Sequence, residues 1–375
     1  MALVLNDEQL MLKESARDFL RERAPVSHLR KLRDEGVQEG FSRAVWAEMV
    51  DLGWSAILVP EAQGGLDYGF TGIGIVLEET GRTLTPGPLL ATALIGVAAI
   101  RLAGSDAQCA AILPAVASGQ SLLALACDES PRHDPQQVAS RALETPGGYS
   151  LSGRKIAVLD GHVADRFIVS AATDSGLDLF LVPADAAGVE VEAFAALDTH
   201  RVAELRFENV ALEPGQRLAG TAAGDGQATL ERILDAARIG AAAEMLGLAQ
   251  EAFERTVDYL KERRQFGVPI GSFQALQHRA AFLYGEIESC RSLLLKALQT
   301  LDAGTQDVAQ LASMSKAKIG ETARLAANEA IQMHGGIGMT DEFDIGFFLK
   351  RLQILDSLYG DRYYHLDRFA RLRGY

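Results

Sequence analysis

The chain has 375 residues, a length that favours two or three domains over a single hydrophobic core. Apolar residues make up 48% of it and charged residues 23%, which is the composition of an ordinary soluble globular protein. The formal net charge of −14 argues against a nucleic-acid groove or an anionic membrane surface as the binding partner, because both favour Lys and Arg.

Residues 1–118 are predicted to form an N-terminal helical domain. Asn6 stands where an N-cap is needed, and the helix after it carries Leu10, Ala16 and Leu20 at apolar positions. The later helices are expected in the stretches FTGIGIVLEETGRTL, LLATALIGVAAIRLAG and DAQCAAILPAVASG, each ended by Gly or Pro.

Residues 119–215 change character and are predicted to form a middle β domain. Short apolar or alternating runs, bounded by turn residues, indicate strands. These runs are SLLALA, QVASRALE, GYSLSG, RKIAVL, RFIVSAA, LDLFLVPA, GVEVEAF and RVAELRF. The stretch TPGG between the second and third runs is typical of a hairpin turn. Strands at this spacing favour an antiparallel barrel or sandwich.

Residues 216–229 are interpreted as a linker of small residues, and residues 230–375 as a C-terminal helical bundle. Long helices are expected from about Leu230 to Arg264, from an N-cap at Ser272 onward, from about Asp307 to His334, and over the last thirty residues. Four long helices joined by short loops form a bundle. The predicted fold is therefore mostly α, with a central β domain between two helical domains.

The helix expected after Ser272 has an apolar stripe whose spacing alternates between three and four residues. The stripe comprises Phe273, Leu276, Ala280, Leu283, Ile287, Cys290, Leu294 and Ala297. A stripe of this kind predicts packing against other helices.

The three cysteines, Cys109, Cys127 and Cys290, are far apart and form no CxxC pair. They predict neither a disulfide framework nor a zinc site, and no HExxH, GxSxG or P-loop motif is present. The N-terminus lacks a basic region followed by an apolar core, and no apolar run reaches the length of a membrane span. A reducing cytoplasm is the expected location.

The stretch QMHGGIGMTDEF (332–343) packs three glycines into four positions directly after a long apolar helix pattern. Ending a helix needs only one glycine, and each further glycine costs backbone entropy. Either a sharply turning loop or a ligand or second chain in contact with bare backbone would explain the other two.

This stretch and DYLKERRQFGVPIGSFQALQHRAA (258–281) together resemble the acyl-CoA dehydrogenase family. The earlier segment matches the family's Arg-x-x-Phe-Gly…Phe-Gln pattern, and the later one matches its Gln-x-x-Gly-Gly-x-Gly pattern. Domain order, lengths and motif separation agree over essentially the whole chain. The stretches LALACDESPRHDP and KIAVLDGHVADRFIVSA resemble the variant branch typified by the small subunit of pimeloyl-CoA dehydrogenase.

The resemblance implies an FAD cofactor held between the β domain and the bundle, and a CoA thioester substrate beside the flavin ring. A carboxylate removes the α proton while a hydride leaves the β carbon for the flavin. Electrons then pass to an electron-transfer flavoprotein. The resemblance also implies a homo-oligomer, or a hetero-oligomer with an acyl-CoA dehydrogenase homologue, because cofactor contacts cross subunits.

By residue matching, Gln332, Gly335 and Gly336 would lie against the diphosphate and adenosine end of a neighbour's FAD. Arg263 and Phe266 would contact the same cofactor, and Gln274 is expected nearby. The simpler interpretations are a solvated charge for Arg263 and core packing for Phe266. His334, next to the loop, is expected to pack or cap rather than to catalyse.

The family's usual catalytic base is missing. The Glu of a Tyr-Glu-Gly-Thr stretch is replaced by Tyr359 in LDSLYGDRYY, and an ordinary tyrosine pKa near 10 makes a poor base at neutral pH. The alternative position on the long helix is Ala237, which cannot take a proton. Arg238 matches the family's arginine and either orders the active site or forms an ordinary salt bridge. Other candidates for the base are the carboxylates of Asp67, Asp128, Glu129 and Asp361. Each of them is more simply interpreted as a loop or capping residue.

The flavin motifs of the β domain also depart from the family. CDESPRHD (127–134) replaces a run whose hydroxyls bind flavin, and Ala157 and Leu159 replace an aromatic and a hydroxyl residue. The chain's own flavin pocket is therefore expected to be poor, while the surfaces it presents to a neighbour's FAD are expected to be intact. This asymmetry favours a non-catalytic subunit of a mixed assembly over a self-sufficient enzyme. A CoA-ester binding scaffold without redox activity and a monooxygenase or nitroalkane oxidase of the same fold remain the competing classes.

Overall fold

The computed structural model describes residues 3–220 and 222–375. They form two compact units that interleave along the sequence. The helical unit contains the residues up to 34 together with residues 74–86 and 238–375, and the sheet unit contains residues 35–73 and 87–237. None of the helices within the described residues is long and apolar enough to cross a membrane.

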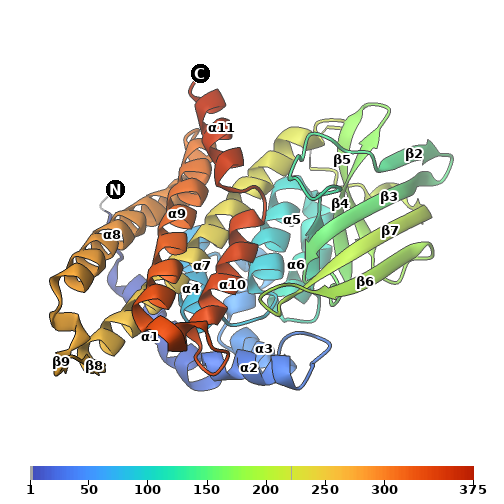
Figure 1. Ribbon diagram of the computed structural model, residues 1–375. Helices are drawn as coiled ribbons and strands as arrows, with labels where there is room; N and C mark the ends of the chain where they lie inside the picture. Colours follow the sequence, from blue (N-terminus) through green and yellow to red (C-terminus); the bar gives the residue numbers. More distant parts are fainter. Residues whose placement is uncertain (1–2, 221) are drawn as a thin grey trace. The chain divides into compact units, whose positions relative to one another are not determined.

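The helical unit is built from long helices and a two-stranded hairpin (Figure 1). It contains α1 (Asp7–Arg23), α2 (Val26–Asp34), the second part of α4 (Gly69–Thr83), most of α7 (Gly226–Glu262), the hairpin β8 (Arg264–Gln265) and β9 (Val268–Pro269), η5 (Ile270–Ser272), α8 (Gln274–Ala303), α9 (Val308–His334), η6 (Gly335–Met339), α10 (Ile345–Ser357) and α11 (Arg362–Leu372).

The start of α1 confirms the expected cap. The Asn6 side chain accepts a hydrogen bond from the Gln9 backbone N–H, and the Gln9 side chain accepts one from the Asn6 N–H, which completes a capping box. Ala16 and Leu20 are buried as expected, whereas Leu10 is 45% exposed. The helix thus presents only its second half to the core.

Glycines allow α4 and α7 to approach backbone to backbone. A Cβ added to Gly247 of α7 would lie 1.7 Å from the Glu78 carbonyl oxygen, and one added to Gly81 of α4 would lie 2.0 Å from the Glu244 carbonyl oxygen. No side chain fits at those separations. The small-residue stretch RIGAAAEMLG is therefore a close helix-packing surface.

Two expected helix boundaries in the bundle are wrong. Ser272 does not cap α8; it lies in η5, where its hydroxyl donates to the Pro269 carbonyl, and α8 starts at Gln274 after Phe273. The last thirty residues form two helices, because Tyr359 (φ 57°) and Gly360 (φ 105°) break the chain between α10 and α11. Two successive left-handed residues cannot continue an α-helix.

The sheet unit combines helices with one seven-stranded sheet (Figure 1). Its helices are α3 (Arg43–Asp51), η1 (Trp54–Ala56), η2 (Glu61–Gln63), the π-helix η3 (Leu89–Gly96), α5 (Val97–Ala103), α6 (Asp106–Ala117) and η4 (Pro214–Gln216). Its strands are β1 (Leu123–Ala126), β2 (Arg141–Thr145), β3 (Gly148–Leu159), β4 (Arg166–Thr173), β5 (Gly176–Pro183), β6 (Val189–Ala195) and β7 (Arg201–Leu212).

The strands pair in the order β1-β4-β2-β3-β7-β6, and β5 also pairs with β4. Most pairs are antiparallel, as expected, and Thr145 pairs with Gly148 across the predicted TPGG turn. The β1–β4 pair is parallel, however, and β2 contacts β4 in parallel at one position. GYSLSG and RKIAVL form one strand, β3, with irregularities in its pairing to β7. Alternation within a strand carries no information on the direction of its partner.

One face of the sheet encloses the unit's apolar core, which includes Phe167, Phe180, Leu151 and Leu205. The segment expected as a linker is partly tied to this sheet, because Arg217 bridges to Phe180 and Asp225 bridges to Leu177. Residue 221 of that segment lies outside the described residues.

Candidate functional site

The glycines after α9 have three different roles. Gly335 ends the helix at φ 65°. Gly338 is buried, and a Cβ on it would lie 2.7 Å from the Ile331 carbonyl oxygen. Gly335 and Gly336 are exposed, and a Cβ added to either would meet nothing within 4 Å. Packing within the chain accounts for Gly338, and the turn accounts for Gly335. Neither accounts for Gly336.

His334 is part of the scaffold of this loop. Its ring is stacked on Tyr259 of α7 with centroids 4.3 Å apart, and its Nδ1 lies 2.7 Å from the Ala330 carbonyl oxygen. Burial lowers the pKa of the imidazole, so the neutral form predominates near neutral pH. The position of His334 is that of a packing residue beside the loop.

Arg263, Phe266 and Gln274 lie together on the hairpin and the first turn of α8, and all three are exposed. Phe266 is 92% exposed in a left-handed backbone conformation (φ 53°), with its ring 6.1 Å from that of Phe273. An Arg263 N–H···O=C Tyr259 hydrogen bond of 2.8 Å connects this hairpin to the residue stacked on His334. Tyr259 therefore contacts both the hairpin and the residue that precedes the glycine loop.

Arg238 and Tyr359 form a separate, interior group. Arg238 is fully buried; its Nε donates to the Tyr359 carbonyl at 3.2 Å, and its Nη2 donates to the Tyr364 hydroxyl at 3.2 Å. Tyr359 is 4% exposed, and its backbone is in the left-handed region. The arginine thus holds the turn between α10 and α11.

Lys316 of α9 belongs to the same interior group and was not identified from the sequence. Its Nζ donates to the carbonyl oxygens of Leu355, at 2.5 Å, and Asp356, at 3.1 Å, in the last turn of α10. Burial, aided by the nearby Arg238 charge, lowers the pKa of Lys316 to about 7 against the opposing effect of Asp356. The sequence does contain a signal for it, because Lys316 interrupts the apolar pattern of α9 three positions before Ile319.

The carboxylates that are alternative candidates for the base are each engaged in a hydrogen bond or an ion pair. Asp361 caps α11 by accepting from the Tyr364 N–H at 2.8 Å. Asp128 contacts His133 Nδ1 at 2.7 Å, and Asp67 lies 3.2 Å from Arg101.

Glu129 lies in the segment between β1 and β2. Its carboxylate accepts from the Lys155 Nζ at 2.7 Å and from the backbone N–H groups of Ala139 and Ser140. Burial alone would raise the pKa of Glu129, but these hydrogen bonds and the lysine charge lower it overall. Lys155 is fully buried and also donates to the Ser170 hydroxyl at 3.0 Å. The loop is therefore closed by its own ion pair.

Three family models match successive parts of the chain. They describe the N-terminal domain (residues 6–120), the middle domain (residues 125–210) and the C-terminal domain (residues 224–372) of acyl-CoA dehydrogenase.

Curated relatives and solved structures agree with these models. The chain is 31% identical to acyl-CoA dehydrogenase IpdE2 of Mycobacterium tuberculosis over 94% of each chain, and 30% identical to an acyl-CoA dehydrogenase of Bacillus subtilis over 93% of each. Its fold is similar to that of a variant of the Tcur3481-Tcur3483 steroid ACAD, with a TM-score of 0.89, 31% identity and 98% of each chain covered. It is also similar to the ChsE4-ChsE5 complex of Mycobacterium tuberculosis, with a TM-score of 0.90, 25% identity and complete coverage of both chains.

The finer resemblance to the pimeloyl-CoA dehydrogenase small subunit is not among these findings and stays a prediction. The expected family and fold are confirmed: the chain belongs to the acyl-CoA dehydrogenase family.

Proposed function

We propose that the chain is a component of an FAD-dependent acyl-CoA dehydrogenase, in which it contributes a cofactor-contacting surface to a homologous subunit that carries the base. The substrate is a CoA thioester, which loses a proton from its α carbon and a hydride from its β carbon. The chemistry that FAD supplies when bound is acceptance of that hydride, and an electron-transfer flavoprotein is the expected electron acceptor.

The observation that carries the proposal is the bare backbone at Gly336. Among the described residues nothing lies within 4 Å of a Cβ added to Gly336, and its backbone is not left-handed, so the fold itself would accept a side chain there. A large ligand such as a dinucleotide requires close access to the main chain, and glycine provides it. Gln332, on the last turn of α9, adds an exposed amide next to the loop.

The hairpin supplies the complementary chemistry. Arg263 is exposed and permanently charged, which suits a diphosphate. Phe266 presents a 92% exposed aromatic ring whose ring contact within the described part of the chain is the edge contact with Phe273. Gln274 is exposed at the first position of α8.

The interior group supports a non-catalytic role for this subunit. Arg238 holds Tyr359 by its backbone carbonyl, and the tyrosine side chain offers no carboxylate to take an α proton. Glu129 is already neutralised by Lys155 in the loop where flavin-binding hydroxyls are expected. A partner subunit would therefore have to provide the carboxylate and the better flavin pocket. The names of two similar structures join two different gene products, Tcur3481-Tcur3483 and ChsE4-ChsE5, which supports a mixed assembly.

The first test is the colour of the purified chain, alone and co-expressed with a homologue encoded beside it. We expect the chain alone to lack flavin absorbance, and the mixed assembly to be yellow and to bleach on addition of an acyl-CoA. A yellow chain that bleaches by itself would contradict the mixed assembly in favour of a homo-oligomeric enzyme. Absence of FAD from every complex would favour the CoA-ester binding scaffold.

The second test separates the cofactor surface from folding. Gly336→Val should leave the thermal unfolding of the chain unchanged but weaken FAD retention in the assembly by about five-fold or more, because overpacking a contact costs about 1–3 kcal/mol. Gly215→Val is the matched control, since a Cβ at Gly215 also meets nothing within 4 Å. Equal FAD retention in both variants would remove the loop from the cofactor site.

A further inference from the structure

We propose that the helical unit contains a second ligand site, a cavity at the N-terminus of α2 that binds the oxyanion group of a small phosphorylated or carboxylated molecule. The cavity has a volume of about 330 Å³. This is the lower end of the range for small-molecule sites, and it is larger than a lone inorganic ion needs. The site is independent of the glycine loop and of the proposed dehydrogenase function.

Four arginines from three helices line this cavity. Arg17 and Arg21 come from the last turns of α1, Arg82 from α4 and Arg255 from α7. The other lining residues are Pro25, Val26, Glu79, Thr83 and Glu251. The lining side chains thus carry four positive and two negative charges, and two carboxylates outside the lining, Glu254 and Asp344, contact Arg82 and Arg255.

The start of α2 adds the positive end of a helix to this arginine-lined cavity. Pro25 and Val26 line the cavity at the point where α2 begins, and the first turn of α2 contains no acidic residue. Pro25 precedes the helix and has no side-chain acceptor with which to cap it. The first N–H groups of a helix have no intrahelical partner and carry the positive end of the helix dipole. In α2 the His28 N–H donates to the Pro25 carbonyl at 2.7 Å, and a bound anion would add an acceptor for the N–H groups that precede it.

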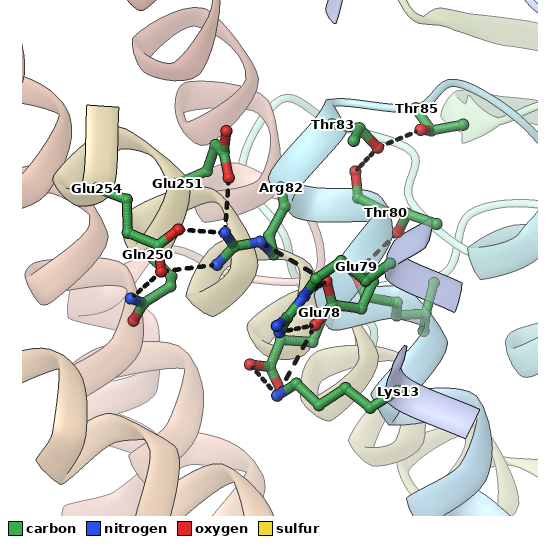
Figure 2. Close-up of polar contacts among 12 residues, drawn as sticks. Lys13, Glu78, Glu79, Thr80, Arg82, Thr83, Thr85, Gln250, Glu251 and Glu254 are labelled. Carbon is green, nitrogen blue, oxygen red and sulfur yellow. Dashed lines mark hydrogen bonds and ion pairs between the residues drawn. The ribbon is translucent and has the colours of Figure 1, made fainter. Parts of the chain in front are cut away.

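Arg82 provides a buried guanidinium with one N–H group outside hydrogen-bond distance of an acceptor in the described part of the chain. It is 4% exposed and pairs with Glu254 and Glu251 through its terminal nitrogens, as Figure 2 shows. Its Nε–H has no hydrogen-bond acceptor among the described residues and lies 3.6 Å from the Glu79 carboxylate. An unsatisfied N–H in a buried guanidinium is costly, and an acceptor in the cavity would relieve that cost.

The carboxylates of the cavity are already committed to other cations. Both oxygens of Glu79 receive the Arg17 guanidinium, at 2.9 and 3.1 Å. Glu251 contacts Arg255 at 2.9 Å and Arg82 at 2.8 Å. Arg21 is exposed at the mouth of the cavity and has no ion-pair partner within residues 3–220 and 222–375. Arg21 is therefore the residue most available to a ligand, and a planar guanidinium binds phosphate or carboxylate through two parallel hydrogen bonds.

The test is a calorimetric titration of the full chain with sodium phosphate and, separately, with sodium succinate, at constant ionic strength and against sodium chloride. We expect saturable binding of one of the two anions beyond that of chloride. The preferred anion identifies the ligand class as phosphorylated or carboxylated. Arg21→Gln should weaken that binding by about tenfold, as expected for loss of one charge-assisted interaction.

Arg141→Gln is the control, because Arg141 is an exposed arginine on β2 outside the cavity. Unchanged binding in this control and weakened binding in Arg21→Gln would support the site. Binding equal in the two variants, or no binding beyond chloride for either anion, would overturn it. This experiment measures anion binding and not FAD retention. Its outcome therefore does not depend on the outcome of the Gly336→Val test.

Discussion

At the scale of single residues, two buried charged side chains stand out because each holds neighbouring helices. Lys316 of α9 is 1% exposed and donates to two carbonyl oxygens at the end of α10. Glu79 of α4 is 1% exposed and pairs with Arg17 of α1. Lys316 satisfies carbonyl oxygens that would otherwise be buried without a donor, and the buried Glu79 carboxylate is itself paired by the partly exposed Arg17. Their contributions depend on charge and can be measured by titration and by neutral substitution.

Lys316 should make stability depend on pH above neutrality. Its pKa falls to about 7 in the folded chain, whereas an unfolded lysine titrates near 10.4. Between these values the unfolded chain holds a proton that the folded chain lacks. The free energy of unfolding should therefore rise with pH from about 7 to about 10, by at most ~1.4 kcal/mol per pH unit. Below about pH 7 this dependence should vanish.

The measurement is urea unfolding of the wild-type chain and of Lys316→Met at pH values of about 6, 7.5 and 9, which bracket the interval between the two pKa values. Lys316→Met should be less stable at each pH, because it leaves the Leu355 and Asp356 carbonyl oxygens without their donor. It should also lose the rise above neutrality. Parallel curves for the two proteins would show that Lys316 does not titrate in this range.

Glu79→Gln should destabilise the helical unit by about 2 kcal/mol, because it leaves the Arg17 guanidinium without its carboxylate partner. Asp367→Asn breaks an exposed pair with Arg371 and should change the free energy of unfolding by less than about 0.5 kcal/mol. Denaturant unfolding of both variants checks the difference. Similar small losses in both would mean that the Glu79 contact contributes little.

At the scale of secondary-structure elements, the contact of α4 with α7 and the exposed start of α8 show opposite uses of small residues. Gly247 has the Glu78 carbonyl oxygen against it, whereas Gly285 of α8 has nothing within 4 Å of an added Cβ. A methyl group has no space at the first position and open space at the second. A glycine-to-alanine substitution should therefore lower the stability of the fold at Gly247 and raise it at Gly285.

Gly247→Ala should cost about 1–3 kcal/mol by forcing α4 and α7 apart. Gly285→Ala should stabilise α8 by about 0.5–1 kcal/mol, because alanine is the better helix former. Thermal unfolding of the two variants measures both effects. A gain from Gly247→Ala would show that the helices can separate without cost.

At the scale of the whole molecule, the chain leaves aromatic side chains uncovered on the hairpin and on the first half of α8. Phe266 is 92% exposed, Phe282 63% and Tyr284 55%. The apolar stripe of α8 is buried from Leu283 onward, while Phe273 at its start is 38% exposed. Exposed apolar surface of this kind is typical of sites that bind a partner, a ligand or a membrane. We interpret this surface as the contact with the adjoining subunit of the proposed assembly.

Phe282→Glu should prevent that assembly without unfolding the chain, because a charge replaces an apolar contact only in the assembled state. Sedimentation velocity of the chain mixed with its homologue should show a smaller species for Phe282→Glu than for the wild type. Leu143→Glu is the control, since Leu143 is 52% exposed on β2. An unchanged sedimentation profile for Phe282→Glu would exclude this surface as the contact.

The sequence determined the local features of this protein, because they depend on neighbouring residues alone. The Asn6 cap, the TPGG hairpin, the strands and the α9 helix that ends at a glycine loop were all predictable from short-range chemistry. The family motifs predict that Gly335 and Gly336 contact a cofactor. The structure adds that a Cβ on either residue would meet nothing within 4 Å.

Only the tertiary structure decided features that depend on distant parts of the chain. The parallel β1–β4 pair joins strands 43 residues apart in register, at Leu123 and Arg166, and no local pattern encodes it. The break at Tyr359 is stabilised by Arg238, which lies 121 positions earlier, and the partners of Lys316 lie on another helix. Periodicity reports which face of an element is apolar, but burial and charge pairing depend on what packs against that face.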